Sequence, residues 1–160
     1  MLLPFLQKNG EHIHLIVDNQ PFTMLGGELH NSSASSPEIL RPLWPQLRKQ
    51  GLNTVLVPVS WELVEPQEGV FDFSLVKELI EGAYQHELRL VLLWFGTWKN
   101  ASSTYVPAWV KQDRIRFFRV VDHNGQTNQA ISPFCIQARD SDARAFSCLM
   151  EFLRENDEHQ

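Results

Sequence analysis

The sequence lacks the features that mark a membrane protein or a nucleic-acid-binding protein. No apolar stretch approaches the roughly 18 residues that a membrane span needs, and the apolar start is too short for a signal peptide and is interrupted by Pro4. The net charge is −5 and no run of lysine or arginine is present. We therefore expect no nucleic-acid partner, no membrane partner and a cytoplasmic location, unless an export signal precedes this sequence.

Residues that bind metals or form disulfides are also scarce. The two cysteines, Cys135 and Cys148, have no metal-ligand or redox spacing, so both are expected to be free thiols. The same absence of ligand spacing holds for the histidines considered as metal ligands, which are His12, His14, His86, His123 and His159. We expect no metal and no cofactor.

What the chain does contain is a core and an excess of aromatic rings. Its 160 residues suffice for one domain, and 43% of them are hydrophobic. Aromatic residues make up 11%, including five tryptophans. Such rings can stack against a ligand, although a tryptophan is more often a core residue.

Three apolar segments predict buried strands, at residues 23–29, 52–59 and 90–93. Helical periodicity predicts a helix that reaches Gln50 but starts late because of its prolines, a second helix capped by Ser74, and a third over residues 141–156. Alternating strands and helices indicate a parallel sheet with right-handed crossovers.

Two further regions complete the expected organisation. Residues 1–22 contain turn residues between two short apolar segments, and they predict an N-terminal hairpin. Residues 97–140 form a connection too long for an idle loop, so we expect it to be partly structured and functional, with a short helix or turn around Trp109. Three strands are few for a finished sheet, and we therefore interpret residues 1–160 as a single partial domain.

Polar and aromatic residues follow each predicted strand. The carboxyl ends of parallel strands meet at one face of a barrel, where side chains distant in sequence form the site. Carboxylates among tryptophans are typical of a glycosidase cleft. The candidate substrate-binding residues are Glu28, His30, Trp61, Glu62, Trp98, Lys99 and Asn100.

Five ordered segments of the chain resemble glycoside hydrolase family 35. They are residues 26–33 (Gly-Gly-Glu-Leu-His-Asn-Ser-Ser), 51–55 (Gly-Leu-Asn-Thr-Val), 61–74 (Trp-Glu-Leu-Val-Glu-Pro-Gln-Glu-Gly-Val-Phe-Asp-Phe-Ser), 92–100 (Leu-Leu-Trp-Phe-Gly-Thr-Trp-Lys-Asn) and 107–111 (Pro-Ala-Trp-Val-Lys). The resemblance is strongest to a bacterial, β-galactosidase-like branch. Family 42 shares part of the third segment and is the alternative.

The resemblance implies the N-terminal portion of a TIM (β/α)8 barrel, with about three βα units after the N-terminal hairpin. It also implies a retaining hydrolase that removes terminal β-galactosyl residues, so a β-galactoside or related glycan is the expected partner. The open edges of a partial sheet predict self-association.

The catalytic pair of the family is not found in this sequence. The family carries two glutamates after its fourth and seventh strands, the acid/base directly after an asparagine, and no such Asn-Glu pair is present here. The family pattern gives no catalytic role to Glu28, Glu62 or Glu65, and Glu65 is expected to order the loop beside Pro66. We therefore assign no catalytic residue and expect these 160 residues to be inactive alone. The alternative is a non-catalytic carbohydrate-binding or interaction protein derived from such a barrel.

Overall fold

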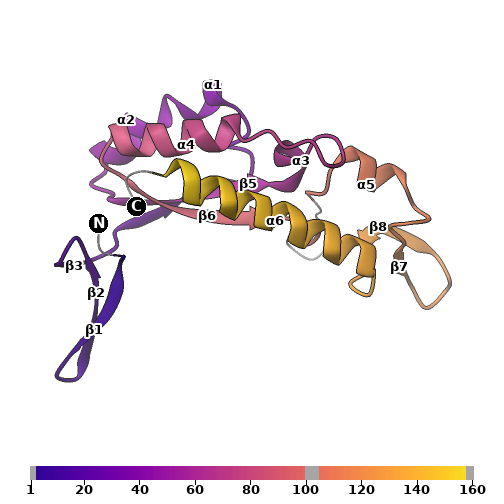
Figure 1. Cartoon of the computed structure of the whole chain (residues 1–160), viewed down its shortest axis with the longest axis horizontal. Coiled ribbons are helices and arrows are strands. Elements are labelled where there is room, and N and C mark those ends of the chain that lie inside the picture. The colour runs from indigo at the N-terminus through magenta and orange to yellow at the C-terminus, as the bar shows by residue number, and fades with distance from the viewer. Residues whose placement is uncertain (1–2, 100–104, 158–160) are drawn as a thin grey trace.

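The computed structural model describes residues 3–99 and 105–157, which are arranged around a three-stranded parallel sheet (Figure 1). The strands are β4 (Gly26–Glu28), β5 (Thr54–Ser60) and β6 (Arg89–Phe95), in the order β4-β5-β6. Both neighbours pair with β5 in parallel. The three predicted parallel strands are confirmed, although β4 is shorter than expected.

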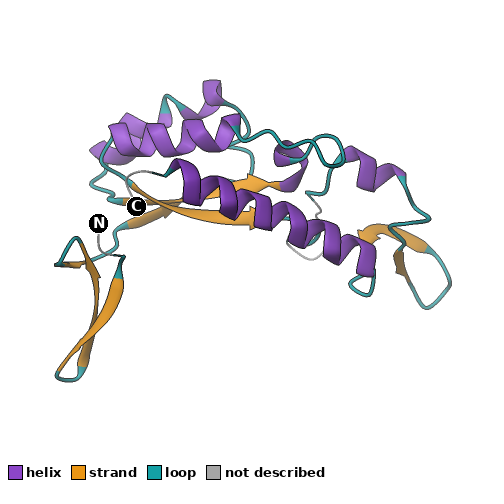
Figure 2. Cartoon of the chain, in the orientation of Figure 1, coloured by secondary structure: helices purple, strands orange, loops and turns teal. Residues whose placement is uncertain are grey.

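The central strand, β5, supplies the middle of the core. Its alternate residues Val55, Val57 and Val59 are buried and belong to one apolar cluster that includes residues from helices on the same side of the sheet. β-branched residues suit this position because they pack well on a pleated surface. Figure 2 shows the helices along one side of the sheet.

The third strand is less buried than the sequence suggests. An unbroken apolar run predicts a strand covered on both faces, but residues 90–93 are only partly buried. In the described part of the chain, β6 is an edge strand with no neighbour beyond it. The prediction of burial on both faces is therefore wrong for this structure: Leu90 and Leu92 pack against the core cluster on the side of the helices, whereas the alternate residues of β6 are not part of that cluster.

Two short helices replace the single first helix that the sequence predicts. They are α1 (Pro37–Leu40) and α2 (Leu43–Lys49), with Pro42 at the N-cap of α2. The expected late start of the regular helix is confirmed. Gly51 follows with φ +80°, the left-handed conformation that glycine tolerates at a helix end.

The next helical segments follow β5. These are the single turn α3 (Trp61–Val64) and the amphipathic helix α4 (Ser74–Gln85). The prediction that Ser74 caps α4 is wrong, since Phe73 occupies the N-cap and Ser74 is the first helical residue. Asp72 instead satisfies the first N–H of the helix, since its Oδ1 accepts a hydrogen bond from the Ser74 N–H at 2.9 Å. Hydrogen bonds from Ser74 lower the pKa of the Asp72 carboxyl.

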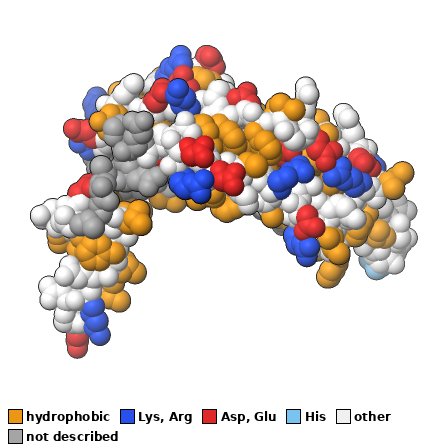
Figure 3. All heavy atoms as spheres, viewed as in Figure 1, with side chains coloured by type: hydrophobic (Ala, Val, Ile, Leu, Met, Phe, Trp, Pro, Cys, Tyr) orange, Lys and Arg blue, Asp and Glu red, His pale blue; other side chains and the backbone are white. Residues whose placement is uncertain are grey.

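The N-terminal hairpin is part of a three-stranded antiparallel sheet. Its strands are β1 (Phe5–Asn9), β2 (His12–Val17) and β3 (Gln20–Phe22). Asp18 and Asn19 form the two-residue turn between β2 and β3, with φ of 50° and 62°. Positive φ at both positions is the geometry of a type I′ turn, which suits the twist of a hairpin. This sheet projects from the rest of the molecule and carries exposed hydrophobic side chains (Figure 3).

The long connection after β6 is partly structured, as predicted. It contains α5 (Ala108–Gln112) and an antiparallel hairpin of β7 (Arg119–Val121) and β8 (Thr127–Ile131). The last helix, α6 (Ile136–Asn156), begins five residues earlier than predicted and runs along β6 (Figure 1). A second apolar cluster joins these parts; its buried members are Trp61, Val106, Val110, Phe117, Ile131, Cys135, Ala138 and Ala145. None of the described helices is long and apolar enough to cross a membrane.

Gly82 in α4 provides a test of the core packing. A Cβ atom at this position would lie 2.3 Å from Nε1 of Trp44 on α2, so the two helices approach closely there. Glycine to alanine in a helix normally stabilises by about 0.5–1 kcal/mol. Here we expect Gly82→Ala to lower the free energy of unfolding by about 1–3 kcal/mol through overpacking, measured by urea denaturation.

The exposed Gln85 at the end of the same helix is the control. Gln85→Ala should change the free energy of unfolding by less than about 0.5 kcal/mol. A stabilised Gly82→Ala variant would contradict the packing described for α2 and α4.

Candidate functional site

The carboxyl ends of the three parallel strands define the candidate face, but they do not end at one level. Ser60 at the end of β5 lies opposite Phe95 at the end of β6. Glu28, the last residue of β4, lies opposite Leu56, four residues before the end of β5. At about 3.3 Å per residue, β4 stops roughly 13 Å short of the other two strands.

The residues predicted after β4 are exposed. Glu28 and His30 both lie at the surface, and the only polar partner of the His30 ring in the described structure is Ser32, with Nδ1 and Oγ 3.4 Å apart. Among the described residues, no hydrogen bond, ion pair or ring contact connects either side chain with Glu62, Trp98 or Lys99. The structure therefore places both residues at the carboxyl end of β4 without joining them to the other candidates.

The two residues predicted after β5 lie in different environments. Trp61 has no exposed surface and belongs to the second apolar cluster, where its ring meets Trp109 edge-on at 5.8 Å. Glu62 is partly exposed and pairs with Lys111 of α5, with Oε2 and Nζ 2.6 Å apart. A sugar could reach Glu62 in this structure, but it could not reach Trp61.

The segment after β6 carries the most accessible aromatic candidate. Trp98 is 42% exposed, and Nζ of Lys99 lies 4.3 Å from the ring centroid of Phe95, a cation–π arrangement. Asn100 lies outside the described residues. An exposed indole beside a lysine can stack on the apolar face of a sugar and bind its hydroxyl groups, so this segment fits the predicted sugar contact best.

Glu65 organises the loop after β5 from inside the protein. Its carboxylate is fully buried and accepts hydrogen bonds from Nε1 of Trp61 at 2.7 Å, from the Gly69 N–H at 2.8 Å and from Nη2 of Arg144 at 2.7 Å. Its backbone carbonyl accepts a fourth, from Nε1 of Trp109 at 3.1 Å. The expectation that Glu65 orders this loop agrees with these contacts.

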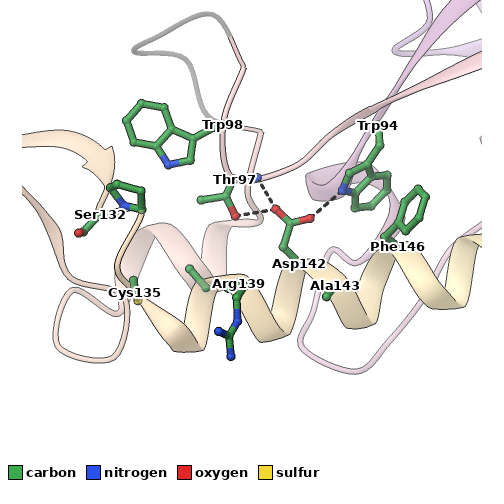
Figure 4. A pocket seen from close by; sticks show the side chains of 11 residues that line it. Trp94, Thr97, Trp98, Ser132, Cys135, Arg139, Asp142, Ala143 and Phe146 are labelled. Carbon is green, nitrogen blue, oxygen red and sulfur yellow. Dashed lines mark hydrogen bonds between the residues drawn. The ribbon is translucent and has the colours of Figure 1, made fainter.

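Asp142 of α6 makes a second network, on the loop after β6 (Figure 4). Its Oδ1 accepts a hydrogen bond from Nε1 of Trp94 at 2.7 Å. Its Oδ2 accepts two from Thr97, one from the backbone N–H at 2.7 Å and one from Oγ1 at 2.6 Å. These hydrogen bonds anchor Thr97, the residue that directly precedes Trp98.

A cleft of about 460 Å³ lies between this loop and α6 (Figure 4). Its volume falls within the range of small-molecule sites. The lining is mostly apolar, and the residues around it are Trp94, Thr97, Trp98, Ser132, Pro133, Cys135, Ala138, Arg139, Asp142, Ala143 and Phe146. Trp98 thus borders both the strand-end face and this cleft.

Sequence reasoning missed Asp142 and Arg144. A signal for Asp142 was present, since it precedes Ala145, Phe146 and Leu149 by three, four and seven residues and therefore lies on the helical stripe that these apolar residues form. A charged residue on such a stripe needs a partner inside the protein. For Arg144 no comparable signal exists, because at 3.6 residues per turn it lies on the side of the helix opposite this stripe.

Two other charged groups near the site have shifted pKa values. The Arg116 guanidinium, hydrogen-bonded to Glu68, lowers the pKa of that carboxyl. Burial lowers the pKa of Arg119, and the nearby charge of Arg114 lowers it further. Nε and Nη1 of Arg119 have no hydrogen-bond partner among the described residues, whereas its Nη2 donates to the Lys111 carbonyl at 2.7 Å.

Within the described residues, no group of histidine, cysteine and acidic side chains is placed to hold a metal ion.

The Glu65 network is expected to matter for stability. Glu65→Ala would leave the N–H groups of Trp61 and Gly69 without their acceptor, and a buried donor left unpaired costs about 1–3 kcal/mol, so we expect the free energy of unfolding to fall by about 2–5 kcal/mol. Glu62→Ala is the control, because a solvent-exposed ion pair contributes less than about 1 kcal/mol. Urea denaturation of both variants measures the difference, and equal losses would contradict the structural role of Glu65.

Comparison with known proteins gives consistent matches. The sequence model described as "Glycosyl hydrolases family 35" matches residues 14–129. Beta-galactosidase 11 of Arabidopsis thaliana is 32% identical over 113 residues, which cover 66% of this chain and 13% of that protein. A beta-galactosidase of Xanthomonas manihotis is 43% identical over 61 residues, which cover 36% of this chain and 9% of that protein. The chain thus spans only about an eighth of the length of these relatives, or less.

Solved structures share the fold at low sequence identity. The endo-glycoceramidase II from Rhodococcus sp. superimposes with a TM-score of 0.58 at 20% identity, over 90% of this chain and 40% of that one. The catalytic domain of a beta-amylase from Paenibacillus polymyxa gives a TM-score of 0.60 at 17% identity, over 82% of this chain and 33% of that one. These likenesses concern the fold alone.

Proposed function

Because the chain belongs to family 35 of the glycosyl hydrolases, as its five segments indicated, we propose that it forms part of the substrate-binding face of a retaining β-galactosidase-like enzyme. The enzyme would hydrolyse terminal β-galactosyl residues of a glycan. The observation that carries this proposal is the exposed Trp98–Lys99 segment at the carboxyl end of β6. In barrel enzymes, that end of the strands is where the site is built.

The finer architecture is part of the same proposal. Strands β4, β5 and β6, with the helices that follow them, would be about three βα units of an eight-stranded barrel. Parallel pairing and helices along one side of the sheet support this arrangement. The interior of the barrel would lie on the other side.

The catalytic carboxylates would come from other segments of a longer protein. A retaining glycosidase needs two carboxyl groups about 5–5.5 Å apart. Glutamates after β5 are already engaged: Glu65 inside the protein and Glu62 with Lys111. Glu28 lies at the end of the short strand β4, away from both. The geometry of these three carboxylates therefore supports a binding role for this part of the chain.

The open sheet edges give a proposal about association. In the described chain, β4 and β6 each have one edge that no strand covers, and such edges favour pairing with another chain. We propose that the isolated 160 residues self-associate. Sedimentation velocity should show an apparent mass that rises with concentration, and a constant monomer mass would contradict this.

A second candidate function is non-catalytic carbohydrate binding. The engagement of Glu62 and Glu65 by cations, together with the exposure of Trp98, favours it for the isolated chain. Both candidates require sugar binding, and they differ in hydrolysis by the longer protein.

The isolated chain should bind galactose-terminated glycans without cleaving them. On a glycan array we expect Trp98→Ala to remove most of the binding signal, since the sugar ring can no longer stack on the indole ring. Ile13→Ala is the matched control, because Ile13 is also exposed and apolar but lies on the N-terminal sheet. An aryl β-galactoside should not be hydrolysed. Clear hydrolysis that a single carboxylate change abolishes would overturn the binding-only role.

A further inference from the structure

The loop that carries Trp98 is held by a residue from a distant part of the sequence. Asp142 lies in the second turn of α6, 45 residues after Thr97. It nevertheless accepts hydrogen bonds from both the backbone N–H and the hydroxyl group of Thr97. The backbone hydrogen bond fixes the chain at the residue that immediately precedes Trp98. The orientation of the exposed indole therefore depends on where α6 places this carboxylate.

The geometry requires a carboxylate at this position. Three donors converge on Asp142: the Trp94 indole N–H on Oδ1 and two Thr97 groups on Oδ2. A carboxylate accepts at both oxygens, whereas an asparagine amide accepts at only one and directs an N–H at the other donor. The isosteric amide would therefore leave a donor facing a donor.

Space around the carboxylate is equally restricted. A Cβ atom on Gly96 would lie 2.4 Å from Oδ2 of Asp142, so the loop passes close to the carboxylate because residue 96 has no side chain. One turn further along α6, Phe146 packs edge-on against the Trp94 ring, with centroids 5.9 Å apart. The Trp94 ring is thus held by a hydrogen bond from its N–H to Asp142 and by its edge-on contact with the Phe146 ring.

We propose that Asp142 is a positioning residue for sugar binding, which sets the Trp98–Lys99 segment through Thr97 and Trp94. This proposal rests on the proposed function for sugar binding by the Trp98–Lys99 segment, whereas the positioning of Trp98 by Asp142 can be tested without a sugar. In this proposal Asp142 acts through its hydrogen bonds to Thr97 and Trp94, and not by contact with the sugar. Its effect is to reduce the number of orientations that the Trp98 indole can adopt before a galactoside arrives.

The experiment uses the 160-residue chain labelled with 5-fluorotryptophan. The five tryptophans give five ¹⁹F resonances, and Trp98→Phe assigns the one of interest. The test variant is Asp142→Asn. Its matched control is Asp140→Asn, the same chemical change two residues away on the same helix. Among the described residues, the exposed Asp140 side chain pairs only with neighbouring Arg139.

Without ligand, Asp142→Asn should shift or broaden the Trp98 resonance, while Asp140→Asn leaves it in place. With methyl β-D-galactoside, the dissociation constant should rise about tenfold in Asp142→Asn, the effect expected if the Trp98 indole then occupies its binding orientation about a tenth of the time. An unchanged Trp98 resonance in folded Asp142→Asn would overturn the proposal. If the unsubstituted chain does not bind the galactoside while Asp142→Asn still shifts the Trp98 resonance, the proposed function fails and the positioning role stands.

A rescue distinguishes positioning from general loss of stability. Trp94→Phe removes the donor that an asparagine amide would oppose. The double variant Trp94→Phe/Asp142→Asn should therefore return the Trp98 resonance and the galactoside affinity most of the way to those of Trp94→Phe alone. Additive losses in the double variant would overturn the proposal. Should Asp142→Asn fail to fold, Thr97→Val replaces it, because it removes only one hydrogen bond, and an unmoved Trp98 resonance in that folded variant would count against the proposal equally.

Discussion

A buried charge that must be satisfied by hydrogen bonds is the constraint on which the candidate site depends. The Glu65 carboxylate has no contact with solvent, and burying it without partners would cost more than the fold could sustain. Its partners come from three places: Trp61 at the start of α3, Gly69 in the following loop and Arg144 on α6. Satisfying one carboxylate therefore fixes the path of the loop after β5 and its position against the last helix.

The same helix holds the other loop of the site face in the same way. Asp142 accepts hydrogen bonds from Trp94 and Thr97, so the segment after β6 is also anchored from α6. In both networks an indole N–H donates to a carboxylate, which satisfies the polar end of a large ring while its body packs in an apolar cluster. Charged residues of α6 thereby fix the positions of the loops, whereas apolar residues hold the strands against the helices.

Regular patterns in the sequence predicted the elements that such patterns determine. The valines of β5 and the apolar stripe of α4 are local signals, and both elements formed where expected. The candidate site was less predictable, because the role of a tryptophan depends on which way it faces once the chain is folded. Trp61 and Trp98 both follow a strand, yet the turn of α3 directs Trp61 into the core while Trp98 remains exposed. Arg144 lies 79 residues from Glu65, and Thr97 lies 45 residues from Asp142, separations over which no local pattern carries information.

The spacing of the two anchoring residues on α6 has a mechanical consequence. Asp142 and Arg144 are two positions apart, which at 3.6 residues per turn is a rotation of roughly 200° about the helix axis. They therefore leave the helix on nearly opposite flanks, one toward each loop. Because both loops are hydrogen-bonded to this one helix, any displacement of α6 would be transmitted to both of them.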